Sequence, residues 1–212
     1  MPDLSPPKRT TYRHGDLRHA LIAAGTELAR AGGPDAVVLR EATRRVGVAP
    51  NAAYRHFADR RALLDAVCSA AQSLLAVAIE NKLANVPVTG DPAGVARARL
   101  RAVGTGYIRF AQTEPGLFRT AFSVSRDLNR VGDPARAGAS GLSPFLLLGS
   151  VLDELVDAGA LPEERRPAAE LLAWSSVHGL SMLLIDGPLR ALKQKQAQAI
   201  IERLLDMVDQ GL

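Results

Sequence analysis

The sequence has a single cysteine, few aromatic residues and no long uninterrupted apolar run. The lone thiol of Cys68 cannot form an internal disulfide, which favours a reducing compartment, and its apolar surroundings predict a core position. Because no run of about 18 apolar residues occurs, we expect no membrane span and no membrane partner. The first fifteen residues lack the apolar stretch of a secretory leader, so we expect a cytoplasmic protein.

Motifs that carry common enzyme chemistry are also missing. The sequence contains no G-x-S-x-G turn, no phosphate-binding glycine loop, no H-E-x-x-H and no cysteine pair. Ser175 and His178 lie three residues apart with Asp186 nearby, which leaves a helical hydrolase-like enzyme as the alternative reading. Neighbours on one helix seldom form a catalytic triad, however. We therefore expect no enzyme, no catalytic residue, no metal and no cofactor.

The residues that are abundant favour helix. Runs of β-branched residues are scarce, whereas Ala, Leu, Arg and Glu dominate the composition. Hydrophobic residues make up 47% of the chain, which is enough for a packed core. Apolar residues recur at helical spacing between breaks at glycine and proline. These features predict an all-α protein of about nine helices.

The positive charge is concentrated near the N-terminus. Residues 1–67 hold 11 Lys and Arg against 7 Asp and Glu, whereas residues 68–212 hold 15 of each. A small basic unit on a neutral body suits attraction to nucleic-acid phosphates, although a randomly charged surface is the alternative reading. Residues 1–14 add three prolines and no apolar period, so we expect a flexible basic arm that either lies along DNA or has no role.

A helix-turn-helix pattern follows this arm. Residues 15–32 predict a first helix with an apolar stripe, and residues 39–46 predict a second. Gly47 can adopt the left-handed conformation that ends a helix, and Pro50 suits the first turn of a third, short helix over 50–56. Ala49 cannot cap that helix, so packing has to hold it. Such a unit places its last helix in the major groove of double-stranded DNA.

Residues of the third helix have the chemistry to read bases. Asn51 suits an adenine edge and Ala52 a thymine methyl, while Tyr54 and His56 carry polar tips that suit phosphates. Tyr54 can also reach a base, with core packing as its alternative role. We assign Phe57 to the core. Asp59 predicts the N-cap of a long fourth helix to about Leu83, which opens with two arginines that suit a nearby phosphate or remain solvated. The predicted DNA contacts are Arg40, Arg44, Pro50, Asn51, Ala52, Tyr54, Arg55, His56, Arg60 and Arg61.

The remaining sequence predicts a helical body with a ligand site. Further helices are expected over residues 92–113, 115–122, 144–159, 162–185 and 190–210, with Asp91 as the cap of the first and Ser143 at the start of the third. The irregular segment over 123–141 is expected to form a mobile lid or rim. An apolar site with a few polar tips is typical of small-molecule binding, while core packing is the alternative for each residue. The predicted ligand contacts are Tyr107, Phe110, Phe118, Phe122, Phe145, Trp174, His178 and Met182.

The last two predicted helices also suggest self-association. The eighth has two apolar stripes, one through Trp174 and His178 and one through Ser176 and Gly179, so one of them can face a second chain. The eighth and ninth helices of two chains would then form a four-helix interface. The predicted dimer contacts are Leu172, Ser176, Gly179, Leu183, Ile201, Leu204, Leu205 and Val208.

Residues Tyr12 to Val67 resemble the DNA-binding domain of the TetR family of bacterial transcriptional regulators. The resemblance rests on YRHGDLRHAL, VGVAPNAAYRHF and ADRRALLDAV. WSSVHGL and IDGPL further resemble a C-terminal domain of one branch of that family, named for its Trp, His and Gly. Ala49 departs from the usual capping Ser or Thr, which weakens one expected phosphate contact, and Arg60 replaces a common Lys.

The resemblance implies an all-α homodimer that binds a partly palindromic operator. An unknown small-molecule effector in the C-terminal domain would change the spacing of the recognition helices and release the DNA. Such a protein is most often a repressor. The chain would then divide into an arm over 1–14, a DNA-binding domain over 15–61 and a ligand-binding and dimerisation domain over 62–212.

Overall fold

The computed structural model describes residues 14–124 and 130–212, so the predicted basic arm falls almost wholly outside the described residues. The described residues form helices and short 3-10 turns without a strand, which confirms the all-α prediction. The nine α-helices within them are α1 (His14–Gly32), α2 (Leu39–Val46), α3 (Pro50–Ala53), α4 (Arg60–Leu83), α5 (Pro92–Thr113), α6 (Pro115–Ala121), α7 (Pro144–Asp157), α8 (Ala169–Ile185) and α9 (Gln194–Gly211).

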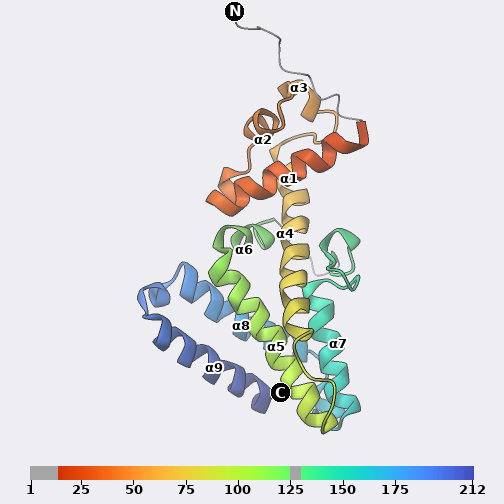
Figure 1. Cartoon of the computed structure of the whole chain (residues 1–212), viewed down its shortest axis with the longest axis vertical. Helices are drawn as coiled ribbons and strands as arrows, with labels where there is room; N and C mark the ends of the chain where they lie inside the picture. The colour runs from red at the N-terminus through yellow and green to blue at the C-terminus, as the bar shows by residue number, and fades with distance from the viewer. Residues whose placement is uncertain (1–13, 125–129) are drawn as a thin grey trace, which may run out of the picture.

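The molecule is elongated, and α4 connects its two parts. Helices α1 to α3 lie together at one end, and α4 runs from this end into the larger body formed by α5 to α9 (Figure 1). The N-terminal turns of α4 pack on α1, where Leu63 and Val67 are fully buried. Its later turns pack on α5 and α6. One continuous helix therefore belongs to both parts of the molecule.

Side-chain caps start three of the helices at the predicted residues. Asp59 accepts a hydrogen bond from the backbone of Ala62 at 2.8 Å, and Asp91 accepts one from Gly94 at 2.9 Å. Ser143 accepts the N–H of Leu146 at 3.4 Å at the start of α7. Each bond satisfies one of the backbone donors that a helix leaves unpaired in its first turn. The predicted starts of α4, α5 and α7 are confirmed.

Helix α3 is shorter than the predicted 50–56. It ends at Ala53, and Tyr54 is its C-cap. The N–H groups of His56 and Phe57 both bond to the carbonyl of Ala53 at 2.9 Å, so the chain tightens into a turn. This turn directs Phe57 into the core, where it is 3% exposed. Helix α3 therefore ends in a turn that leads to the buried Phe57.

Helix α8 begins seven residues later than predicted. The chain instead forms a 3-10 turn over Glu163–Arg165, and Ala168 adopts a left-handed conformation with φ of 64°. Pro167 has no N–H to donate into a continuous helix, which explains the break. The buried side of α8 also differs from both predicted stripes. Its buried residues are Ala169, Ala173, Val177, Leu180, Ser181 and Leu184.

Close contact between α4 and α5 forms the centre of the body. A Cβ at Gly106 would lie 2.9 Å from the Cα of Ile79, so glycine permits this approach. By length and composition α4 could cross a membrane, but half of its most apolar window is buried inside the protein. Cys68 lies on this buried side, as predicted, with its Sγ 3.0 Å from the carbonyl of Ala121. We therefore assign α4 as a core helix.

The described part of the irregular segment is tied to α4. The Ser73 hydroxyl donates to the carbonyl of Ala137 at 2.6 Å, and Glu80 accepts the N–H groups of Ala139 and Ser140 at 2.9 Å each. These bonds help to hold the pKa of Glu80 below its usual range, against the opposing effect of burial. The segment over 130–141 is thus a fixed wall in this structure, and the rest of the predicted lid, residues 125–129, lies outside the described residues.

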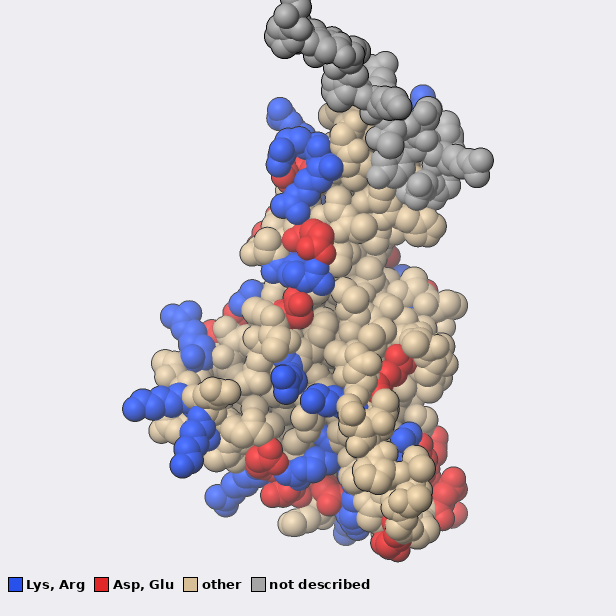
Figure 2. Space-filling model, in the orientation of Figure 1, with Lys and Arg blue, Asp and Glu red and all other residues tan. Residues whose placement is uncertain are grey.

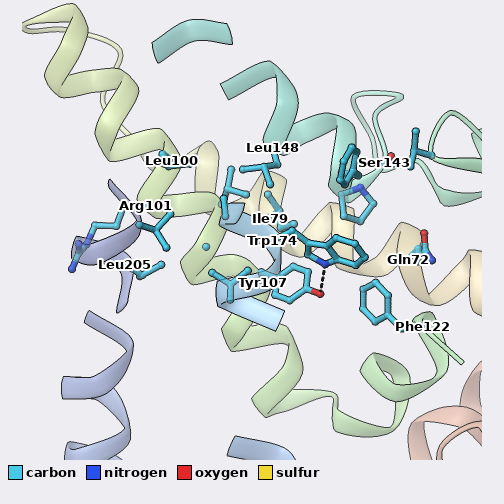
Figure 3. Close-up of a pocket in the computed structure, with 18 of the residues that line it drawn as sticks. Gln72, Ile79, Leu100, Arg101, Tyr107, Phe122, Ser143, Leu148, Trp174 and Leu205 are labelled. Carbon is cyan, nitrogen blue, oxygen red and sulfur yellow. Dashed lines mark hydrogen bonds between the residues drawn. The ribbon is translucent and has the colours of Figure 1, made fainter. Parts of the chain in front are cut away.

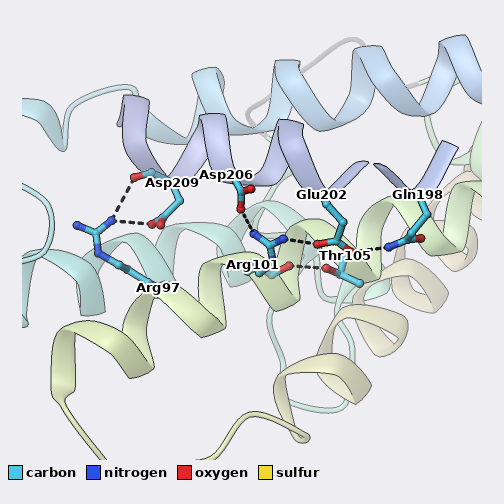
Figure 4. Close-up of polar contacts among 7 residues, drawn as sticks. All are labelled: Arg97, Arg101, Thr105, Gln198, Glu202, Asp206 and Asp209. Carbon is cyan, nitrogen blue, oxygen red and sulfur yellow. Dashed lines mark hydrogen bonds and ion pairs between the residues drawn. The ribbon is translucent and has the colours of Figure 1, made fainter. Parts of the chain in front are cut away.

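Ion pairs join α5 to α9 along their length. Arg97 bonds to Asp209 at 2.7 Å, and one turn later Arg101 bonds to both Glu202 and Asp206 (Figure 4). These partly exposed pairs lie beside the apolar contact of α9 with the body, which buries Ile201, Leu205 and Val208. This row places α9 against the body of its own chain.

Candidate DNA-binding surface and internal cavity

The turn between α2 and α3 has helix-turn-helix geometry. Gly47 has φ of 75°, the left-handed conformation predicted for it, and the N–H of Val48 bonds to the carbonyl of Thr43 at 3.0 Å. Ala42 and Ala53 are fully buried, and such small side chains allow two helices to approach closely. The apolar stripe of α1 covers them through the buried Leu21 and Leu28.

The opposite face of this unit is exposed and carries the predicted DNA contacts. Tyr54 is 58% exposed at the end of α3. His56 and Ala52 are half-buried beside it. The other predicted contacts are exposed: Arg40, Arg44, Pro50, Asn51, Arg55, Arg60 and Arg61. Figure 2 shows Lys and Arg side chains gathered at this end of the molecule, on the side where Figure 1 draws α2.

Two of these arginines have partners within the protein. Arg44 binds Glu41 through two hydrogen bonds of 2.9 and 2.7 Å, and these bonds lower the pKa of Glu41. Arg60 donates to the carbonyls of Val37 and Pro34 at 2.8 Å each. Those carbonyls lie more than twenty residues earlier in the chain, and for this reason the sequence did not reveal them. Arg60 therefore fixes the start of α4 to the loop between α1 and α2.

Arg18 is a basic residue that the sequence did not single out. Its guanidinium carbon lies 5.4 Å from the ring centroid of Phe57, within the range of a cation–π contact. It is exposed on α1, close to the turn that follows α3. The contact pairs a residue of α1 with the aromatic anchor of the turn, which no local pattern shows.

The body contains a partly open cavity of about 330 Å³, which is lined by residues of α4, α5, α7, α8, α9 and the segment before α7. Figure 3 shows Arg101 and Leu205 at one end, Tyr107 and Trp174 in the middle, and Gln72, Phe122 and Ser143 at the other. The volume lies within the range of small-molecule sites. Its walls are mostly apolar.

The structure brings four of the eight predicted ligand contacts to the cavity, namely Tyr107, Phe122, Phe145 and Trp174. The other four do not line it. Phe118 and Phe110 are buried in the core nearby, and Met182 is exposed on α8. His178 lies against Phe118 and Phe122, with ring centroids 5.5 and 4.9 Å away. Helical spacing alone did not separate these positions.

A chain of hydrogen bonds joins Trp174, Tyr107 and His178. The indole Nε1–H of Trp174 donates to the Tyr107 hydroxyl at 3.0 Å, which lies 2.8 Å from Nδ1 of His178 (Figure 3 draws the first bond). Burial raises the pKa of Tyr107 and lowers the pKa of His178, so the neutral forms are favoured. Neutral His178 can then accept a hydrogen bond from the Tyr107 hydroxyl through Nδ1. The hydrogen bonds thus fix the side chains of Trp174 and Tyr107, which line the cavity.

Several polar residues of the cavity were not found from the sequence. They come from α4, α5 and the segment before α7, and they are Gln72, Arg101, Arg136 and Ser143. Gln72 donates its amide to the carbonyl of Ala121 at 2.7 Å. Burial of an arginine or a serine beside a cavity depends on tertiary packing, so no periodic pattern could have identified them.

The outer face of α8 and α9 exposes apolar side chains. Leu172 is 60% exposed, Leu183 is also exposed, and a Cβ at Gly179 would meet nothing within 4 Å. On α9, by contrast, the predicted dimer contacts Ile201, Leu205 and Val208 are buried against their own chain, and Leu204 is half-buried. The exposed apolar residues of α9 are Ile200 and Met207. The outward face of α9 is therefore rotated from the predicted one.

The geometry does not assemble the alternative catalytic triad among the described residues. Ser175 donates to the carbonyl of Leu172 at 3.0 Å, His178 contacts Tyr107, and Asp186 binds Arg119 at 2.6 Å. This ion pair lowers the pKa of Asp186. No cluster of three or more potential metal ligands occurs in the described parts of the chain.

Comparison with known families matches both parts of the chain. A family model described as tetracyclin repressor-like, C-terminal domain, matches residues 100–208, about half of the chain. A second model, described as bacterial regulatory proteins, tetR family, matches residues 21–67. No curated protein matches the chain.

Solved structures share the whole fold. A protein of unknown function from Rhodococcus sp. RHA1 is 24% identical, with a TM-score of 0.72 over 96% of this chain and 99% of that one. A TetR-family transcriptional regulator from Pectobacterium atrosepticum is 19% identical, with a TM-score of 0.62 over 96% of each chain. The TetR-family regulator PfmR from Thermus thermophilus is 21% identical, with a TM-score of 0.52 over 91% of this chain and 98% of that one.

Proposed function

Since the chain belongs to the TetR family and is a DNA-binding transcriptional regulator, we propose that it is a repressor released by a small molecule. In this proposal a homodimer binds a palindromic operator in the cytoplasm. Regulators of this family are generally not enzymes, and no described cluster favours a second function. We also propose that the chain belongs to the branch named for its Trp, His and Gly. The hydrogen bonds that Trp174 and His178 both form with the Tyr107 hydroxyl support this proposal.

The observation that carries the proposal is the continuity of α4. Leu63 and Val67 of this helix anchor the helix-turn-helix, and Gln72 and Ile79 line the cavity. A helix transmits a displacement along its length because its backbone hydrogen bonds keep it stiff. A ligand that shifts the cavity end of α4 would thus move α3. The packing of Leu63 and Val67 also favours counting the first two turns of α4 with the DNA-binding unit.

Helix α6 supplies a second connection. A Cβ at Gly116 would lie 2.3 Å from the carbonyl oxygen of Ala29, so α6 rests directly on the end of α1. Arg30 pairs with Glu114 beside this contact at 2.9 Å. The other end of α6 leads into Phe122, which lines the cavity. A ligand in the cavity can therefore shift both α4 and, through α6, α1, and these two helices hold α3 in position.

The exposed apolar face of α8 and α9 supports homodimerisation. Exposed contiguous apolar residues are unusual on a monomer and commonly mark an interface. The small Ser176 and Gly179 between Leu172 and Leu183 would allow a second α8 to approach closely. A closed dimer would then present two copies of α3 to two operator half-sites.

Fluorescence anisotropy with DNA from beside the gene for this chain tests the proposal. We expect binding tighter than to unrelated DNA of equal length by about a thousandfold or more at moderate salt. Equal affinity for both DNAs would contradict a sequence-specific repressor. A thermal-shift screen then selects compounds that stabilise the protein. The ligand-release proposal requires that at least one of them lowers the operator affinity.

A further inference from the structure

We propose that the cavity takes an uncharged aromatic compound with a hydroxyl or N–H donor, and that the side-chain oxygen of Gln72 accepts the hydrogen bond from this donor. The inference rests on the proposed function, since it assigns the chemistry of the effector site. It concerns binding alone, however, so it can be tested without DNA.

Gln72 places a buried amide in the wall of a mostly apolar cavity. The residue is 9% exposed, and its Nε2 donates to the carbonyl of Ala121 at 2.7 Å. This bond fixes the orientation of the amide, because a carbonyl oxygen can only accept. Oε1 diverges from Nε2 at the same carbon, so it is directed away from Ala121. The polar atom that remains is therefore an acceptor.

Oε1 of Gln72 has an unused capacity to accept a hydrogen bond. The bond to Ala121 is the one hydrogen bond that described residues form with this side chain. A buried acceptor without a donor is unfavourable, and a ligand that supplies a donor removes that cost. Because Gln72 lines the cavity, at the end where Figure 3 also shows Phe122, a bound compound can supply it.

The charges around the cavity favour an uncharged ligand. No Asp, Glu or Lys occurs among the described residues of its lining, so a cation would find no opposite charge there. The two arginines of the lining already have partners. Arg101 binds Glu202 and Asp206 (Figure 4), and Arg136 also interacts with other groups of the chain. An anion would therefore lack a free guanidinium, and an uncharged compound avoids the cost of burying a charge.

Aromatic rings line the middle of the cavity. The ring centroids of Phe122 and Phe145 each lie 6.1 Å from that of Trp174. The polar atoms of Trp174 and Tyr107 bond to each other at 3.0 Å, and the Tyr107 hydroxyl also contacts His178, so both residues present mainly ring surfaces. Rings favour edge-to-face and offset contacts with another ring. A flat ring system therefore suits this region better than an alkyl chain.

The same glutamine joins two helices that hold the DNA-binding unit. Gln72 belongs to α4, and Ala121 is the last residue of α6. Both helices pack on α1. A donor that binds Oε1 therefore acts on a side chain that ties α4 to α6.

Isothermal titration calorimetry of the full-length protein can compare probes that differ in the donor. Indole and benzofuran have nearly the same shape, but only indole carries an N–H, and 2-naphthol and 2-fluoronaphthalene form a second pair. In at least one pair we expect the compound with the donor to bind about fivefold or more tightly, because its match leaves Oε1 buried without a partner. Two further probes should bind more weakly than 2-naphthol: 2-naphthoate because it is charged, and octan-1-ol because it has no ring.

Three variants locate the preference for a donor. Gln72→Met keeps an unbranched side chain without the oxygen, so it should abolish the preference while benzofuran and 2-fluoronaphthalene still bind. Gln72→Glu keeps an acceptor oxygen and should retain the preference. Gln112→Met removes an exposed glutamine of α5 outside the cavity and should change no affinity.

Four results would each overturn the inference: equal affinities within both pairs, no binding of any probe to the unmodified protein, tighter binding of 2-naphthoate or octan-1-ol than of 2-naphthol, or a preference that survives Gln72→Met. If Gln72→Met binds no probe at all, Gln72→Glu decides, because loss of the preference in that variant also overturns the inference.

The operator experiment is separate from these titrations. A donor compound that binds through Gln72 without releasing DNA would leave this inference standing and contradict the release mechanism. A compound without a donor that releases DNA, while both pairs bind equally, would do the reverse.

Discussion

At the scale of single residues, Tyr54 offers a test of DNA recognition that should leave the stability of the fold unchanged. Its ring is 58% exposed at the end of α3, so its removal costs the folded state little. We predict that Tyr54→Ala weakens operator binding by about 1–3 kcal/mol, the range of one good base contact. Anisotropy titrations on operator and unrelated DNA measure this loss, and Asn51→Ala should lose a similar amount.

Tyr54→Phe refines the assignment, because it removes the hydroxyl and keeps the ring. An unchanged thermal unfolding midpoint serves as the control for all three variants. If Tyr54→Ala leaves the operator affinity unchanged, the orientation assigned to α3 is wrong.

Arg60 and Arg61 are neighbours with different expected roles. Arg60 donates to the carbonyls of Val37 and Pro34, so we predict that Arg60→Ala lowers the free energy of unfolding by about 1–2 kcal/mol, as lost hydrogen bonds to a charged group do. No described residue forms a hydrogen bond with the Arg61 side chain, so Arg61→Ala should leave stability unchanged. Urea denaturation measures both values.

DNA binding tests both arginines as phosphate contacts. A phosphate contact by Arg61 predicts that Arg61→Ala reduces the slope of log K against log salt by about one, equally for all DNA sequences. Arg60→Ala should also weaken binding to all sequences alike if its exposed edge reaches a phosphate. A change in sequence preference for either variant would contradict a phosphate role.

At the scale of elements, the contact between α6 and α1 depends on a glycine. A Cβ at Gly116 would lie 2.3 and 2.5 Å from the carbonyl oxygens of Ala29 and Arg30, and backbone atoms cannot yield as a flexible side chain does. We predict that Gly116→Ala lowers the free energy of unfolding by about 1–3 kcal/mol through overpacking. Gly132→Ala, which has open space around it, serves as the matched control in denaturant titrations.

The predictability of elements from sequence depended on how local their determinants are. Caps and breakers lie within a few residues of the ends that they define, so Asp59, Asp91 and Gly47 fixed their helix boundaries correctly. Pro167 is an equally local signal, but the prediction of α8 followed the apolar pattern and continued the helix across this proline. Helix α3 ends three residues earlier than predicted, in a turn that leads to the buried Phe57, and such burial depends on tertiary packing.

The DNA-binding surface and the cavity also differed in how far the sequence predicted them. The DNA-binding surface follows from one contiguous stretch, and the structure exposes most of the residues expected on it. The cavity joins five helices and a segment without period, so its aromatic residues were found only in part and Arg136 and Ser143 not at all. The sequence could not show which apolar residues of α9 face the body and which face outward. That depends on how α9 packs against α5, where Arg101 pairs with Glu202 and Asp206.

At the scale of the whole molecule, the apolar face of α8 and α9 predicts the assembly. Leu172 is 60% exposed on this face, and a charge there would be buried without a partner in a dimer. We predict that Leu172→Asp converts the proposed dimer to a monomer in sedimentation experiments. Operator affinity should fall by roughly 100-fold, because the two half-sites are then no longer bound by one linked molecule.

Val88→Asp is the matched control for this charge. Val88 is 83% exposed in the connection between α4 and α5, so the same substitution meets only solvent and should leave both dimer and affinity unchanged. A Leu172→Asp protein that remains dimeric would move the interface away from this face, and a monomer with full operator affinity would refute the paired half-sites.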